Sequence, residues 1–212
     1  MPNNSCENTS IYDSLAFCTG QTSLPGLRKV VFYTPKRNIV RWPTLPESAI
    51  NNMEEIAVYQ GDFVMASDAV FKRIDMSLNK GVVDYEPQGE IPSRTFLNKG
   101  SFKHPFNNEK ATAFARLANA EDFVFVTQQR DGKFRVLGNE MFETDTKVSG
   151  STGEGTTGDV GTNINVEVTD VCPAPFYVGT LVTENGEIDC SGTPTNTSSP
   201  GTSSPDPEPD PS

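Results

Sequence analysis

The sequence predicts a mainly β protein: a β-sandwich or barrel-like domain with one flanking α-helix and a long mid-chain loop. Two hairpin signals support this fold class, because Asp131-Gly132 and Asn185-Gly186 each separate two short runs rich in β-branched and aromatic residues. A single amphipathic segment, residues 109–118, has helical periodicity. With 212 residues and 13 Phe, the chain has the size and the apolar content for one core.

The strand signals lie in short segments bounded by Gly, Pro, Asn and Asp. One of them, residues 56–65, contains Gly61-Asp62, which predicts a tight turn or a bulge. Another places Ile164, Val166 and Val168 on one face. Strands are expected at residues 27–33, 56–65, 70–78, 82–85, 123–126, 133–137, 141–148, 164–168, 176–183 and 187–189.

The helix is expected to begin at Glu109, because Asn107-Asn108 can cap it and the glutamate lies at the positive end of the helix dipole. Its apolar face has the spacing i, i+3, i+4 and i+7, so the helix should lie against the side of a sheet. That face comprises Ala111, Phe114, Ala115 and Ala118, and Leu117 is expected to extend it. Residues 46–49 are compatible with a shorter helical turn.

Residues 86–106 are expected to be a long loop interrupted by short strands, because prolines and glycines recur along them. These are Pro87, Gly89, Pro92, Gly100 and Pro105. A loop of this length inside a compact domain usually serves function or contacts, so we expect this one to reach a neighbouring molecule.

The composition divides the chain into three parts. Residues 1–25 form a polar N-terminal arm with a short apolar stretch, and residues 26–190 form the β-rich domain. Residues 191–212 are rich in Ser, Thr and Pro and contain no apolar residue apart from proline, so they are expected to be a disordered, acidic tail. The repeated Asp-Pro and Glu-Pro steps favour an extended backbone there.

The charge excludes one broad class of function. With 17 basic and 28 acidic residues the net charge is −11, whereas nucleic-acid binding depends on Lys and Arg that neutralise phosphates. No segment approaches the apolar length of a transmembrane helix, and the first residues show neither the basic nor the apolar region of a secretory signal. We therefore expect no membrane partner.

The cysteines do not predict a metal site. Cys6, Cys18, Cys172 and Cys190 lack the spacing of a zinc or redox motif, and the chain has one histidine. Four reduced, partly buried thiols are the favoured interpretation. A disulfide that ties the two ends of the chain is the alternative.

Three further features were weighed as catalytic or binding sites. His104 is the one possible imidazole base, but no nucleophile motif accompanies it, so a structural role is favoured. Residues 153–158 match G-x-G-x-x-G, yet a strand signal follows where a dinucleotide site needs a helix, so a loop between strands is favoured. The acidic groups are interpreted as solvated surface; they are Glu54-Glu55, Glu121-Asp122, and Glu143 with Asp145. The sequence thus predicts no catalytic, cofactor-binding or metal-binding residue, and no enzyme.

Trp42, the single tryptophan, lies near a basic cluster, which would suit contact with an acidic neighbour if the ring were exposed. A buried structural tryptophan is the favoured alternative. The basic cluster consists of Lys29, Lys36, Arg37 and Arg41.

The arrangement of these elements resembles the tail tube (major tail) proteins of tailed bacteriophages. The resemblance rests on residues 122–177: the FVFV run, Asp131-Gly132-Lys133, the RVLG run, the Gly/Thr loop, the INVEV run and the closing residues 172–177. This stretch is similar to the helix, hairpin and final sheet edge of that family, which has no diagnostic residue motif.

The resemblance implies a structural virion protein that is assembled in the host bacterial cytoplasm and becomes part of the tail. Its subunits would form a homo-oligomeric ring, usually hexameric, whose inner strands close a β-barrel. Stacked rings would form a hollow tube through which DNA passes without specific binding, next to other tail proteins. The arm and the 86–106 loop would reach adjacent subunits, and the tail would point outward.

The charge takes on a second meaning in such a ring. The C-terminal tail holds −3 through Asp206, Glu208 and Asp210, which leaves −8 on residues 1–190. If enough of that charge faced the lumen, the lining would repel DNA and let it slide. Two other classes remain open at this stage: a surface-binding, adhesin-like or fibre-associated β-domain without catalytic activity, and an enzyme with an unrecognised carboxylate site.

Overall fold

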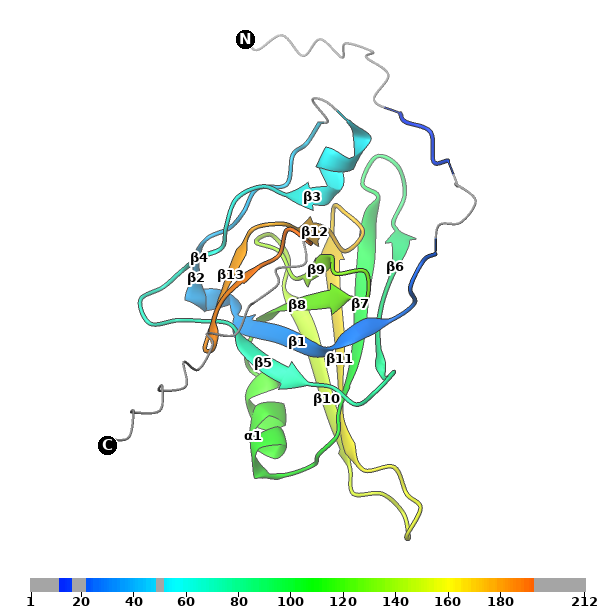
Figure 1. The fold of residues 1–212 in the computed structure, drawn as a ribbon, viewed down its shortest axis with the longest axis vertical. Coiled ribbons are helices and arrows are strands. Elements are labelled where there is room, and N and C mark those ends of the chain that lie inside the picture. Colours follow the sequence, from blue (N-terminus) through cyan, green and yellow to red (C-terminus); the bar gives the residue numbers. More distant parts are fainter. Residues whose placement is uncertain (1–11, 17–21, 49–51, 193–212) are drawn as a thin grey trace, which may run out of the picture.

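Two antiparallel-rich β-sheets pack face to face in the computed structural model, which describes residues 12–16, 22–48 and 52–192 (Figure 1). The larger sheet has six strands in the order β3-β12-β9-β8-β1-β5, and the smaller has four in the order β10-β11-β7-β6. The predicted mainly β sandwich with one helix is confirmed. Both sheets stay open, and the described residues form no closed barrel.

The larger sheet comprises β1 (Leu27–Pro35), β3 (Val58–Tyr59), β5 (Lys72–Asp75), β8 (Phe123–Gln129), β9 (Phe134–Leu137) and β12 (Phe176–Tyr177). The smaller sheet comprises β6 (Gly81–Gln88), β7 (Thr95–His104), β10 (Thr144–Ser151) and β11 (Gly161–Asp170). Two small ribbons pair β2 (Ile39–Arg41) with β4 (Val64–Met65) and β13 (Thr180–Thr183) with β14 (Gly186–Asp189). Short 3₁₀ helices occupy Lys36–Asn38 and Met53–Ala57.

The larger sheet is buried on both faces, which explains why the FVFV run of β8 shows no polar alternation. Val124 and Val126 belong to a core beneath the two small ribbons, together with Phe63, Phe71 and Tyr177. The phenylalanines of the same strand face the other way. Phe123 and Phe125 enter a second core between the two sheets, where they meet residues of β7, β9 and β11.

Helix α1 (Glu109–Ala118) begins as predicted, because the side chain of Asn108 accepts a hydrogen bond from the Ala111 backbone at 3.0 Å. It packs beside β10 and the interior between the sheets (Figure 1). Ala111 and Ala118 are buried, and the Phe114 ring lies 5.1 Å from Tyr33 and 5.6 Å from Phe123 between ring centroids. The predicted helical face is therefore the packed one. The predicted extension of this face to Leu117 is wrong, because Leu117 is 65% exposed.

Both predicted hairpin turns are present. Gly132 joins β8 to β9 with φ +99°, and Gly186 opens β14 with φ +110°. Positive φ strains residues that have a Cβ atom, which is why glycine follows Asp131 and Asn185 at these two turns.

The predicted long loop at residues 86–106 is wrong. Residues 95–104 form β7, the central strand that pairs with both β6 and β11, and only residues 89–94 connect β6 to β7. The prolines and glycines in this region are compatible with strands. Pro87 lies on the edge strand β6, which needs no backbone N–H donor on its unpaired side. Gly100 lies in β7, where the absence of a side chain leaves room for Leu137.

Other boundaries also differ from the predictions. Residues 56–65 divide between a 3₁₀ helix, β3 and β4, and residues 176–183 divide between β12 and β13. The described residues near the predicted turn, 46–48, contain no helix. Of the predicted arm, the described residues 12–16 and 22–25 form no helix or strand and are exposed. Most of the predicted tail, residues 193–212, lies outside the described residues.

Candidate functional site

The outer face of the four-stranded sheet is not covered by another layer of the described residues. Alternation along its strands sends Phe102, Ile164 and Val166 inward to the core. Polar and charged side chains therefore occupy the outward positions. On the outward positions of β7 and β11 lie Lys99, Ser101, Lys103, Asn163, Asn165, Glu167 and Thr169, and on those of β6 and β10 lie Val82, Asp84, Glu86, Gln88, Asp145, Lys147 and Ser149.

Ion pairs cross this face from strand to strand. Lys99 contacts Glu86 at 2.5 Å, and Lys147 contacts Asp145 at 2.7 Å and Glu167 at 3.8 Å. These hydrogen bonds raise the pKa of Lys99 and of Lys147. Four carboxylates and three lysines occupy the outward positions of these strands, so the charges nearly cancel and no basic stripe exists there to bind a polyanion.

Among the described residues neither edge of this sheet pairs with a further strand, although α1 packs beside β10. β6 and β10 each have eight residues, and each pairs with one neighbouring strand only. On the edge strand β6, the side chains of Val82 and Tyr85 are 44% and 53% exposed. Edge strands of soluble proteins usually carry charged residues or proline to prevent pairing with another chain, so exposed apolar side chains are unusual there. An unpaired edge with exposed apolar side chains is a template for another strand.

His104 lies at the end of β7 in a structural setting. Its Nδ1–H donates to the backbone carbonyl of Asp75 at 2.8 Å, and its ring meets the edge of Phe106 with 5.7 Å between centroids. This bond links the end of β5 to the smaller sheet. No Ser, Thr or Cys nucleophile contacts the imidazole among the described residues, so its geometry is that of a cross-link between elements.

The G-x-G-x-x-G segment forms the tip of the β10–β11 hairpin, which extends beyond the body of the sandwich (Figure 1). β11 follows it, whereas a pyrophosphate site needs a helix N-terminus. Asp159 pairs with Lys103 of β7, and this hydrogen bond lowers the pKa of Asp159. The interpretation as a loop between two strands is confirmed.

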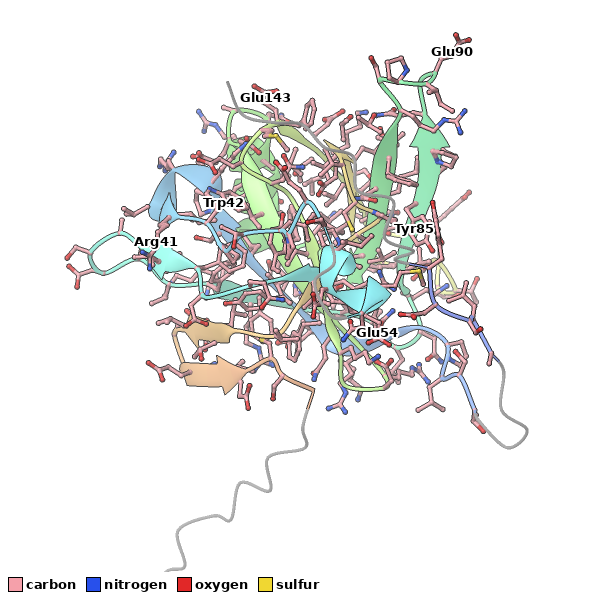
Figure 2. All side chains as sticks on the ribbon, turned by 90° about the horizontal axis from the view of Figure 1, so that it is seen from above. Arg41, Trp42, Glu54, Tyr85, Glu90 and Glu143 are labelled. Carbon is pink, nitrogen blue, oxygen red and sulfur yellow. The ribbon has the colours of Figure 1, made fainter. Side chains whose placement is uncertain are left out.

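The predicted acidic groups do not converge. Figure 2 shows Glu54 and Glu143 at separate places on the molecule. Asp122 pairs with Lys36 at 3.4 Å and also accepts the Thr144 backbone N–H at 3.0 Å, while Glu121 pairs with Arg37. These carboxylates hold the start of β8 to neighbouring elements, and they do not form the facing pair that glycoside hydrolysis needs.

Trp42 packs against the core beneath the small ribbons, with its ring 5.5 Å from that of Phe63 between centroids. The basic cluster around it is dispersed, because Lys36 and Arg37 turn toward β8 and Arg41 lies exposed on β2 (Figure 2). Trp42 is partly buried, so its packing against Phe63 agrees with a structural role while part of the residue remains at the surface. The dispersal of the basic residues removes the cluster on which the contact with an acidic neighbour depended.

The thiols that the structure describes are buried. Cys172 and Cys190 are free, and burial raises their pKa to about 11 and about 12. Cys6 and Cys18 lie outside the described residues. Within the described ranges, no group of three or more His, Cys, Asp and Glu side chains is placed to hold a metal ion, and no helix has the length and apolar content to cross a membrane.

Sequence reasoning missed a buried polar cluster where β11 leads into β12. Asn98 donates to the Cys172 carbonyl at 3.0 Å and accepts the Ala174 N–H at 2.9 Å, although it is 0% exposed. Asp170 accepts the Val171 N–H at 2.7 Å, but its second carboxylate oxygen has no hydrogen-bond partner. Burial raises the pKa of Asp170. These side chains fix the segment that crosses from the smaller sheet to the larger one. No sequence signal marks them, because their partners are backbone groups of that crossing segment.

The described residues therefore offer a polar sheet face between two edge strands, and their candidate catalytic side chains do not converge. Comparisons with protein-family models, with curated proteins and with solved structures find no match for this chain.

Proposed function

We propose that this protein is a tail tube subunit of a tailed bacteriophage. In this proposal it assembles into rings that stack into a hollow tube for DNA passage. The observation that carries the proposal is the four-stranded sheet, which is polar on its uncovered face and open at both edges, β6 and β10. The resemblance of residues 122–177 to tail tube proteins points the same way.

The strand directions suit ring closure. All three pairings within the sheet are antiparallel, so its two edge strands run in opposite directions. When β6 of one subunit lies beside β10 of the next, the antiparallel alternation continues around the ring. A closed ring leaves no free edge, which removes the hazard of an open sheet. The contact is head-to-tail, so one rotation repeated around an axis generates the whole ring.

The uncovered face would then line the lumen. Its lysines are paired with carboxylates, and Asn, Ser and Thr side chains fill most other outward positions. Such a lining is hydrated and slightly acidic, so it holds no phosphate and lets DNA slide. This role needs no cofactor, metal, membrane or catalytic residue. The partners are copies of the chain, six to a ring in the usual arrangement, and other tail proteins within the virion.

Size-exclusion chromatography with light scattering and negative-stain electron microscopy tests the proposal. We expect rings or tubes at high protein concentration. The double variant Val82→Lys/Tyr85→Lys places charge on the β6 edge, and it should lower assembly at least about tenfold, since edge lysines oppose strand addition. The matched control is Val40→Lys/Val178→Lys, whose parent side chains are 69% and 43% exposed outside this sheet. A strict monomer at high concentration would contradict the proposal, and a monomer that binds glycans or cells would favour the surface-binding class.

A further inference from the structure

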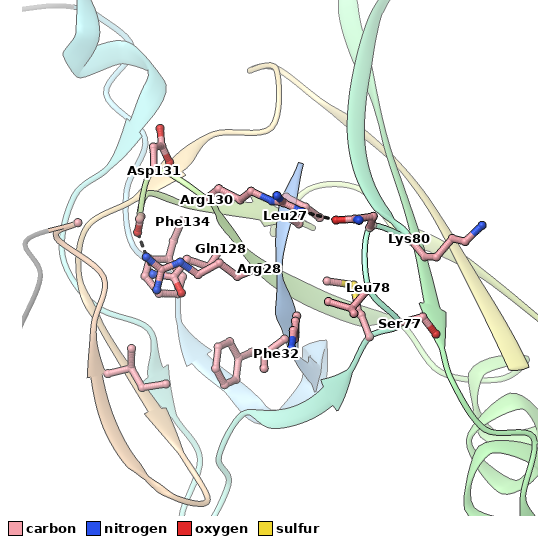
Figure 3. Close-up of a pocket in the computed structure, with 18 of the residues that line it drawn as sticks. Leu27, Arg28, Phe32, Ser77, Leu78, Lys80, Gln128, Arg130, Asp131 and Phe134 are labelled. Carbon is pink, nitrogen blue, oxygen red and sulfur yellow. Dashed lines mark hydrogen bonds between the residues drawn. The ribbon is translucent and has the colours of Figure 1, made fainter. Parts of the chain in front are cut away.

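A groove with a volume of about 910 Å³ opens at one end of the larger sheet, away from the uncovered sheet face (Figure 3). Its walls are the start of β1, the turn 77–81 between β5 and β6, the β8–β9 turn, and the last described residues, 188–192. Its lining includes the apolar side chains of Leu27, Leu78 and Phe134. Leu78 is 66% exposed, so part of this apolar surface faces water.

The groove exists because two neighbouring strands lose their register. Leu27 pairs with Gln129 and Val31 with Thr127, so the β1–β8 ladder is interrupted between Leu27 and Val31. The residues within this interruption include Arg28 and Lys29, which are exposed and line the groove. A bulge of this kind redirects side chains and leaves a local opening in the sheet.

The rim of the groove is basic, whereas the whole chain has a net charge of −11. Arg28, Lys29, Lys80 and Arg130 line it. Arg130 reaches across to the Asn79 side chain (Figure 3). Arg28 and Lys29 form no ion pair with any residue that the structure describes.

The two carboxylates of the lining are already engaged with their own loops. Asp131 accepts the Lys133 N–H at 3.1 Å, and Asp189 accepts the Ser191 N–H at 2.9 Å and the Ser191 hydroxyl at 3.0 Å. These hydrogen bonds leave both carboxylates charged, so the four basic and two acidic side chains give the lining a net charge of +2. Lys80 also lies near Asp159 of the β10–β11 hairpin and lowers the pKa of that carboxyl. Arg28 and Lys29 are therefore the basic side chains that remain for an anion.

The chain itself supplies an anionic segment at this place. Gly192 lines the groove, and its carbonyl lies 3.5 Å from the position that a Cβ on Gly132 would occupy. The tail that continues from it, residues 193–212, has three carboxylates and no Lys or Arg. Asp206 follows Gly192 by 14 residues, and 14 residues of chain can span about 20 Å, which is enough to reach across the groove.

The N-terminal arm of the same chain is the weaker candidate for this groove. Its Asp13 accepts the Met53 N–H at 3.0 Å, which holds residues 12–16 against the 3₁₀ helix instead. The tail also has the advantage of tethering, because a short flexible linker raises the local concentration of its acidic end to about the millimolar range.

We propose that the acidic tail, residues 205–211 (PDPEPDP), docks into this groove of its own chain. The carboxylates of Asp206, Glu208 and Asp210 lie against Arg28 and Lys29, and the prolines cover the apolar wall at Leu27 and Leu78. A Pro-rich segment suits such a surface because its extended backbone is already restricted before it binds. This inference does not depend on the proposed function, since it concerns a different surface and one copy of the chain.

The test measures how strongly the groove binds a labelled synthetic peptide of residues 193–212, by fluorescence anisotropy on full-length protein. In the wild type the attached tail competes, so binding should be weak. The variant Asp206→Asn/Glu208→Gln/Asp210→Asn neutralises the attached tail outside the described fold, and it should bind the added peptide at least about tenfold more tightly. Raising the salt concentration should weaken that binding, because the contacts are ionic.

Charge reversal then locates the site. With the tail neutralised, Arg28→Glu/Lys29→Glu should reduce peptide binding at least about tenfold, while Arg41→Glu/Lys110→Glu, with the same change in net charge outside the groove, should leave it within about twofold. Circular dichroism confirms that each variant is folded. Equal binding by wild-type and neutralised chains, or equal effects of the two reversals, would overturn the proposal. The proposal would also be overturned if the charge-reversal variant in the groove changed only the self-association of the protein, since a second copy of the chain would then occupy the groove.

Discussion

Gly100 of β7 lies so close to Leu137 of β9 that a Cβ atom at position 100 would come within 2.5 Å of the Leu137 side chain. The two sheets touch at this point because one partner has no side chain. Gly100→Ala should therefore lower the free energy of unfolding by about 1–3 kcal/mol through overpacking. Urea unfolding monitored by circular dichroism measures the change.

The matched control for that substitution is Ser101→Ala, one residue along the same strand. Ser101 occupies the outward face and its hydroxyl donates to Asn165 at 2.9 Å in an exposed position. Its loss should change stability by no more than about 0.5 kcal/mol. Equal effects at the two positions would show that the close approach of the sheets is not what constrains residue 100.

Asn98 holds the residues between β11 and β12 with hydrogen bonds from both ends of its amide. Asn98→Leu would leave the Cys172 carbonyl and the Ala174 N–H buried without partners. We expect a loss of about 2–4 kcal/mol, since each orphaned group loses its partner without regaining water. Chemical denaturation measures this loss, and Asn165→Leu on the exposed face serves as the control. A near-neutral Asn98→Leu variant would contradict the role assigned to the amide.

The pH dependence of stability should carry the signature of Asp170. Burial raises the pKa of this carboxyl in the folded state, against weaker opposing hydrogen bonds from Asn139 and two backbone N–H groups. A carboxyl with a raised folded-state pKa favours folding while it is protonated, and that contribution disappears as the pH rises through the folded-state value. Asp170 should therefore destabilise the fold increasingly as the pH rises from about 4, its unfolded-state pKa, to its raised folded-state pKa.

Asp170→Asn isolates this contribution. The amide oxygen can still accept the Val171 N–H, and no charge is buried. The difference in unfolding free energy, variant minus wild type, should increase as the pH rises from about 4 to the raised folded-state pKa of Asp170. Thermal melts at a series of pH values give this difference. A difference that is constant with pH would show that Asp170 does not titrate abnormally.

The two described thiols should be protected from alkylation. Cys172 and Cys190 are 6% and 1% exposed, and burial raises their pKa to about 11 and about 12, so little reactive thiolate exists at neutral pH. Iodoacetamide should modify them at least about tenfold more slowly in native protein than in urea-unfolded protein. Peptide mass spectrometry separates these sites from Cys6 and Cys18. Rapid native labelling of Cys190 would contradict its burial.

Local signals were enough to predict many of the elements. The Asn108 cap, the spacing of Ala111 and Ala118, and the Gly132 and Gly186 turns act over a few residues, so they are readable without the fold. The error at residues 86–106 has the opposite origin. Gly100 is required by Leu137, a residue 37 positions later in the sequence, so its reason is invisible to any local pattern.

The candidate surfaces could not be predicted in the same way. Alternation along β7 and β11 shows that one face of the sheet is polar. It does not reveal whether another layer covers that face, or that β6 and β10 are the edge strands. The groove at Arg28 arises from a register shift between β1 and β8, strands that are about 100 residues apart in the sequence.

The sequence by itself determined the β class, the single helix with its cap and the two tight hairpins, because each depends on the period, capping and turn chemistry of neighbouring residues. Only the tertiary structure decided which sheet is buried on both faces, which strands end as open edges, and where the basic residues border a groove. Those properties depend on contacts between distant segments, such as Gly100 with Leu137 and Asn98 with Ala174.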